Sequence, residues 1–157
     1  MKLPFRPHLS AAMSRFLTLP AAVAILLLGA LSPVRATVDD SHSMAMEAAV
    51  DAVKAGFKIR QEYWKGSLKS GDQKVVRQQL FKGNEYWFFL GTESEKITLK
   101  VDVFDRKGNK VNVETKFKES AAAVRVLAPA TGTYLVVFSL TGKDKEEIPW
   151  ALAYGYR

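Results

Sequence analysis

The chain of 157 residues has no cysteine, 48% hydrophobic residues and a formal net charge of +7. The lack of cysteine excludes disulfides, thiolate metal sites and cysteine nucleophiles. Four of the 23 Lys and Arg, but none of the 16 Asp and Glu, lie in the first 36 residues, so the rest carries only +3, spread among acids. Nucleic-acid binding needs a concentrated basic surface and is not expected.

The first 36 residues are typical of a secretory signal peptide. A leader with Lys and Arg but no acid precedes the apolar run "FLTLPAAVAILLLGAL", and "SPVRA" predicts cleavage after Ala36. The alternative is an uncleaved anchor, but the run is shorter than the roughly 20 residues a span needs, and Pro20 interrupts it. We therefore expect a periplasmic or secreted protein without stable membrane insertion after cleavage.

Residues 37–65 are predicted to form a polar lead-in, which includes His42, and one amphipathic helix. The segment "MAMEAAVDAVKAGFKIRQEYW" is rich in helix formers, and Gly66 marks its end. Its apolar residues recur at spacings of three, four and seven, which places them on one stripe: Met46, Val50, Val53, Phe57 and Trp64. This stripe either packs on the following domain or contacts a partner, and the mixed charges of its polar face argue against a basic membrane helix.

From Lys74 onward the hydrophobic period changes to two, which predicts strands separated by short turns. We expect strands at 75–81, 84–91, 96–104, 109–117, 121–127, 133–140 and 147–156. No connection is long enough for parallel crossovers. The prediction for 66–157 is a mainly β domain, an antiparallel jelly-roll-like β-sandwich of about seven to eight strands preceded by the helix. We expect it to be a monomer.

The stretch "LKVDVFDRKGNKVNVETKF" is predicted to be a hairpin with a turn at Asp105 to Asn109. Asp102, Asp105 and Glu114 are its candidate catalytic carboxylates of the glycosidase kind. Cross-strand pairing with neighbouring lysines explains Asp102 and Glu114 more simply.

The usual catalytic and cofactor motifs are missing from the sequence. After the leader the only histidine is His42, and neither an HExxH pattern nor a glycine-rich phosphate loop occurs. We therefore predict a protein that is not an enzyme and that uses no metal or other cofactor.

Aromatic residues are the candidate ligand-binding residues. In "EYWFFLG", Tyr86 and Phe88 share one face of a strand while Trp87 and Phe89 share the other. Such a strand is either covered on both sides, with the helix over Trp87 or Phe89, or displays an aromatic platform for a sugar or an apolar ligand. The same alternatives hold for the other tryptophans, so the candidate set is Trp64, Trp87, Phe89 and Trp150.

The succession "GSLKSGDQKVVRQQLFKGNEYWFFLG", "LKVDVFDRKGNKV" and "AAVRVLAPATGTYLVVFS" resembles the bacterial pre-peptidase C-terminal domain. The resemblance covers about residues 66–156 and implies a jelly-roll-like β-sandwich that serves secreted bacterial proteins as an accessory or binding module, often beside a peptidase. Thr98 and Lys100 stand where members of that family commonly carry acids, so an acidic calcium cluster is not expected here. No peptidase accompanies the domain in this sequence.

Two functions remain open on this sequence. The first is a secreted or periplasmic non-catalytic binding module for a carbohydrate, peptide or protein. The alternative is a structural, envelope-associated interaction protein that contacts partners through its N-terminal helix. Solvent-facing aromatics on one sheet face would favour the first, and an uncovered apolar stripe on the helix would favour the second.

Overall fold

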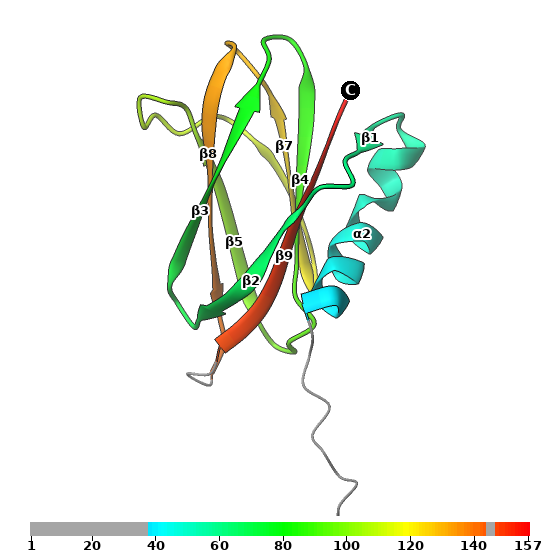
Figure 1. The fold of residues 1–157 in the computed structure, drawn as a ribbon, viewed down its shortest axis with the longest axis vertical. Coiled ribbons are helices and arrows are strands. Elements are labelled where there is room, and N and C mark those ends of the chain that lie inside the picture. Colours follow the sequence, from blue (N-terminus) through cyan, green and yellow to red (C-terminus); the bar gives the residue numbers. More distant parts are fainter. Residues whose placement is uncertain (1–37, 144–146) are drawn as a thin grey trace, which may run out of the picture. The chain divides into compact units, whose positions relative to one another are not determined.

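Two antiparallel sheets pack face to face, and one helix covers the outer face of the larger sheet (Figure 1). The computed structural model describes residues 38–143 and 147–157, which belong to one compact unit, so the predicted signal peptide lies outside the described residues. The predicted mainly β antiparallel sandwich preceded by a helix is confirmed, with nine strands in this part of the chain. No helix in the described ranges is long and apolar enough to span a membrane.

Helix α2 comprises Val38–Lys54, so it begins earlier and ends earlier than the sequence predicted. Gly56 adopts a φ of 89°, which ends the helix. The amide of Phe57 donates to the carbonyl of Ala52 and that of Gly56 to Val53, both at 3.0 Å, in the hydrogen-bond pattern of a Schellman motif. The expectation that the helix continues to Trp64 is wrong because this glycine cap stops it.

The larger sheet has the strand order β1-β9-β4-β7-β6, and β2 also pairs with β9. These strands are β1 (Lys58–Ile59), β2 (Trp64–Lys69), β4 (Glu85–Gly91), β6 (Glu114–Lys118), β7 (Ala121–Leu127) and β9 (Glu147–Tyr156). The smaller sheet has the order β3-β8-β5, with β3 (Gln73–Leu80), β5 (Thr98–Phe104) and β8 (Gly132–Thr141). Strands β1 and β2 were not predicted, since their residues follow the glycine cap that the sequence analysis passed over.

The main core lies between the two sheets and follows the predicted strand parity. In β8, Tyr134, Val136, Phe138 and Leu140 are all buried. In the central strand β4 both faces are buried, as one of the two sequence interpretations required: Phe88 faces the main core, and Phe89 belongs to a second cluster beneath the helix. This second cluster positions the candidate site.

The predicted hairpin at residues 99–117 forms only next to its turn, where Phe104 and Lys110 make an antiparallel bridge and the amide of Val111 donates to the Val103 carbonyl at 2.8 Å. Farther from the turn the predicted pairing is wrong. Strand β5 pairs with β8 in the smaller sheet, whereas β6 pairs with β7 in the larger one, so the connection crosses from sheet to sheet. In the turn, Asp105 Oδ1 accepts the amides of Lys107 and Asn109 at 2.8 and 2.9 Å. Hydrogen bonding to Asn109 lowers the pKa of Asp105 below its ordinary value.

The two other candidate carboxylates of this stretch are held in ion pairs. Asp102 lies 2.7 Å from Lys110 Nζ and 3.6 Å from that of Lys100, and the hydrogen bond to Lys110 lowers its pKa. Glu114 lies 3.2 Å from Arg125. The pairing interpretation is confirmed, with the difference that Asp102 and Glu114 belong to different sheets.

Small residues form the face of α2 that packs on the sheet. Ser41, Ala45, Ala49 and Ala52 are buried. The predicted stripe is wrong for Val50 and Val53, which are 44% and 52% exposed. The large side chains of this contact, Trp87 and Phe89, come from the sheet. A Cβ on Gly91 would lie 2.3 Å from the Ser41 carbonyl oxygen. The helix therefore approaches so closely that only small side chains fit beneath it.

Candidate binding groove

Trp87 and Phe89 project from β4 toward α2 and form the floor of the candidate site. Their rings stack with centroids 5.9 Å apart, and Phe57 meets Trp87 edge-on at 6.4 Å. Only 6% of Trp87 and 1% of Phe89 is exposed. The interpretation that the helix covers these two residues is confirmed, so they do not form an open aromatic platform.

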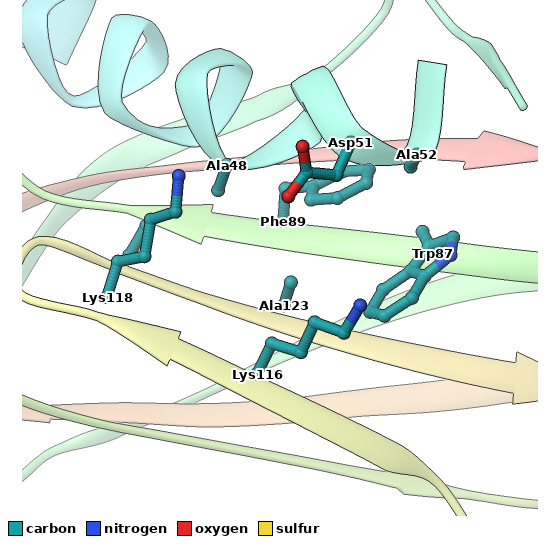
Figure 2. A pocket seen from close by; sticks show the side chains of 9 residues that line it. Ala48, Asp51, Ala52, Trp87, Phe89, Lys116, Lys118 and Ala123 are labelled. Atoms are coloured by element: carbon teal, nitrogen blue, oxygen red, sulfur yellow. The ribbon is translucent and has the colours of Figure 1, made fainter. Parts of the chain in front are cut away.

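A narrow groove lies where α2 stops covering the sheet, above β7 (Figure 2). Ala121 and Ala123 leave space because their side chains are small, and the cavity beside them measures about 50 Å³. Figure 2 shows Lys116 and Lys118 reaching from β6 toward the helix. The full lining is Ala48, Asp51, Ala52, Trp87, Phe89, Lys116, Lys118, Ala121 and Ala123.

The groove continues toward the start of α2 as a wider and more polar hollow of about 300 Å³. The two parts share Ala48, Lys118 and Ala121, so they adjoin one another along α2. The wider part adds Met44, Glu47, Glu119 and Ser120. A narrow apolar part thus lies beside a broader polar part.

The two walls of the groove carry opposite charges. On the β6 wall, Lys116 Nζ lies 5.2 Å from the centroid of Trp87 and 3.8 Å from a carboxylate oxygen of Glu114. The α2 wall presents Asp51 beside the narrow part and Glu47 beside the wide part. A ligand in the narrow part therefore meets ammonium groups on one side and a carboxylate on the other, and in the wide part Glu119 of the β6–β7 turn adds a carboxylate beside Lys118.

The structure does not bring the four candidate aromatics together. Trp150 is 3% exposed in the main core, where it meets Phe138 edge-to-face at 4.8 Å, so it offers no surface to a ligand. Trp64 lies on β2, half-buried and 5.5 Å from Tyr154 by ring centroids. It lines a separate hollow of about 280 Å³ with Arg60, Glu62, Tyr63, Gln78 and Tyr154.

The sequence analysis missed the charged walls of the groove. The alternation of Glu114, Lys116 and Lys118 was interpreted only as the solvent-facing side of a strand, and the small residues in "SAAAV" were not considered as a gap.

His42 was expected in the lead-in before the helix, but it lies in α2 and stacks on Tyr63, with ring centroids 3.8 Å apart. In the described part of the chain, no group of three or more His, Cys, Asp or Glu could hold a metal ion.

Similarity to known proteins is found among solved structures. No family model and no curated protein matches the chain, and the resemblance to the pre-peptidase C-terminal domain remains a prediction. A similar solved structure is the crystal structure of Aeromonas hydrophila PliG, a periplasmic lysozyme inhibitor of g-type lysozyme. It is 17% identical over 61% of this chain and 85% of that chain, with a TM-score of 0.47.

Proposed function

We propose that this protein is a secreted or periplasmic, non-catalytic binding module that holds an extended segment of a partner protein in the groove between α2 and β6. The observation that carries the proposal is the groove itself: an apolar floor under a narrow cavity, adjoined by a polar hollow and walled by opposite charges. Binding sites commonly combine an apolar lining with a few placed polar groups. An accessory role of this kind also agrees with the resemblance to the pre-peptidase C-terminal domain.

The narrow part of the groove suits a small aliphatic side chain better than a sugar ring. A sugar stacks on a free aromatic face, but the helix covers Trp87, and Lys116 Nζ lies over its ring. The cavity of about 50 Å³ has room for a few carbon atoms. Burying a side chain such as Val there would contribute about 1.5–3 kcal/mol. A peptide is therefore favoured over a carbohydrate.

The charged walls add a preference for sequence and direction. An acidic residue beside the buried aliphatic one would meet Lys116 and Lys118, and a basic residue would meet Asp51 or Glu47. Reversing the peptide would place like charges together, which costs affinity. The ligand expected is an extended segment with a small aliphatic residue between charges of opposite sign.

An array that carries both extended peptides and glycans tests the proposal on the chain from residue 37. Peptides of the expected pattern should bind, and amide NMR shifts on titration should change around Ala48, Ala121 and Ala123. Lys116→Glu with Lys118→Glu should weaken binding by about tenfold or more, because two favourable contacts become repulsive. The matched control is Lys96→Glu with Lys143→Glu, which changes the net charge equally outside the groove. Glycan binding, or shifts elsewhere, would refute the assignment.

A second candidate function is a contact made by the exposed side of α2. Val50 and Val53 are large apolar side chains left uncovered on the helix, which was the feature expected of an interaction protein that acts through its helix. Under this alternative, Val50→Ser with Val53→Ser would abolish capture of a partner while leaving the groove intact. The groove proposal predicts unchanged peptide binding in the same variant.

A further inference from the structure

One end of the sandwich gathers several loops that are distant in sequence; we call it the β4-start end. It consists of residues 54–58, 81–84, 105–109 and 128–131. The strand registers place them together, because Glu85 pairs with Leu127, Leu80 with Gly132, Phe104 with Leu135 and Lys58 with Tyr156. Figure 1 shows these turns at the upper end of the view.

Two large apolar side chains are exposed at this end. Phe81 follows β3 and is 55% exposed, and Leu127 ends β7 and is 60% exposed. They are two of the six large apolar side chains that are exposed in the described residues, and burying either would be favourable. These two lie where β3 and β7 end rather than on the walls of the groove.

The chain segments around these residues are held in place by hydrogen bonds, two of which involve the hydroxyl groups of buried tyrosines. The amide of Phe81 donates to the Tyr86 hydroxyl at 3.0 Å, and the Tyr134 hydroxyl donates to the Ala130 carbonyl at 2.8 Å. Between the loops, the amide of Gly83 donates to the Ala128 carbonyl at 2.9 Å. The exposed apolar groups are therefore presented on a preorganised support, which reduces the entropy cost of binding.

Cations lie in the loops at the same end as the two apolar residues. Lys54, Lys58, Lys82, Arg106 and Lys107 come from three of its four segments. No ion pair of the described residues involves any of these five. The one carboxylate of the four segments, Asp105, accepts hydrogen bonds from its own turn. Apart from the attraction between Lys107 and Asp105, the positive charge at this end is not paired in an ion pair of the described residues.

The opposite end of the sandwich carries acidic residues in its loops. Asp72 lies between β2 and β3, Glu93 and Glu95 follow β4, and Glu119 lies between β6 and β7. Only Lys96 and Lys143 accompany them in the described loops of that end. In the described loops, carboxylates thus outnumber cations at this end, whereas cations outnumber carboxylates at the β4-start end, which favours the β4-start end for an anionic partner.

We propose that the β4-start end docks on an anionic lipid surface, with Phe81 and Leu127 entering the interface and the cations of the same end facing the headgroups. The cations are spread over several loops of a protruding end, so a broad anionic surface meets all of them at once. Apolar side chains combined with surrounding Lys and Arg are the two contributions that peripheral membrane binding requires. This inference is independent of the groove and its ligand.

Vesicle sedimentation tests the inference on the chain from residue 37, because residues 35–157 form one compact unit with its own core. The probes are neutral phosphatidylcholine vesicles and vesicles with about 30% phosphatidylglycerol, at an ionic strength of about 0.1 M. We expect binding to the anionic vesicles alone. Phe81→Ser with Leu127→Ser should lower the partition coefficient about tenfold. The control is Phe117→Ser, because Phe117 is 62% exposed on β6 and should not affect binding.

A second pair of variants separates a local docking surface from net charge. Lys82→Glu with Lys107→Glu should reduce binding by about tenfold or more, whereas Lys96→Glu with Lys143→Glu, which changes the net charge equally, should have little effect. Equal losses of vesicle binding in these two charge variants would overturn the inference. Vesicle binding of the Phe81→Ser, Leu127→Ser variant at the wild-type level would overturn it as well. Failure of the wild-type protein to bind anionic vesicles would also overturn it and would favour an acidic protein as the partner. Melting temperatures of all variants exclude unfolding as the cause.

Discussion

Substitution of Gly91 by alanine tests the close contact between α2 and the sheet. A Cβ at this position would lie 2.3 Å from the Ser41 carbonyl oxygen and 2.4 Å from the Ala45 amide nitrogen, whereas ordinary contact begins at 3.4 Å. Both atoms belong to the helix backbone and cannot rotate away as a side chain would. The start of α2 would therefore have to move outward by about 1 Å.

Overpacking of this kind typically costs 1–3 kcal/mol, and the rigid neighbours place Gly91→Ala at about 2–3 kcal/mol. At roughly 3–6 °C per kcal/mol for a domain of this size, the melting temperature should fall by about 6–18 °C. The matched control is Gly132→Ala in β8, where a Cβ would meet nothing within 4 Å. Both variants gain the same entropic benefit from replacing glycine, about 0.4–1 kcal/mol, so their difference isolates the clash.

Urea unfolding followed by circular dichroism measures the two free energies, and we expect the midpoints of the variants to differ by about 1–2 M. Tryptophan fluorescence gives a second measure, since Trp87 lies beneath the helix. If Gly91→Ala and Gly132→Ala agree within about 0.5 kcal/mol, the helix does not rest on the sheet in this way. The groove built between them would then also be wrong.

Three further predictions concern the sandwich. Tyr134→Ala should cost about 3–5 kcal/mol, because Tyr134 is a core aromatic. Tyr134→Phe should cost about 1–2 kcal/mol, because only the hydroxyl is lost, which donates to the Ala130 carbonyl and accepts from the Ala130 amide. A loss below about 1 kcal/mol for the alanine variant would refute the strand parity. The hydrogen bond from Arg125 lowers the pKa of Glu85. The Glu85 carboxylate therefore stabilises the fold above its unfolded pKa of about 4.3, and this contribution is lost as pH falls through the lower folded pKa. Glu85→Gln should lower the melting temperature at pH 7 and have no effect near pH 2, and an equal effect at both pH values would contradict the pairing. Calorimetry with and without a chelator should give the same melting temperature, and a large drop with the chelator would reveal a metal site.

Features that depend on local alternation or turn chemistry could be predicted from the sequence. The parity of β8 and the assignment of Trp87 and Phe89 to one face of β4 follow from the period of two, because side chains of a strand alternate between its faces wherever the strand is placed. That the helix covers this face was one of two alternatives that the sequence left open. The Asp105 turn follows from the Asp side chain and a glycine with positive φ, which act within a few residues. The end of α2 could also have been found, since Gly56 is the local signal that the helical periodicity hid.

Only the tertiary structure decided which elements meet. The turn after β5 allows either a hairpin or a crossing to the other sheet, and the choice depends on β7 and β8, which are distant in the sequence. The buried face of α2 could not be predicted from its large apolar residues, because the face that packs on the sheet consists of small residues. Gly91 lets the helix backbone approach the sheet closely, and Trp87 on the sheet supplies the bulky side chain of the contact. The groove and the basic end exist only after folding, since each is assembled from separate segments whose charges look unremarkable along the chain.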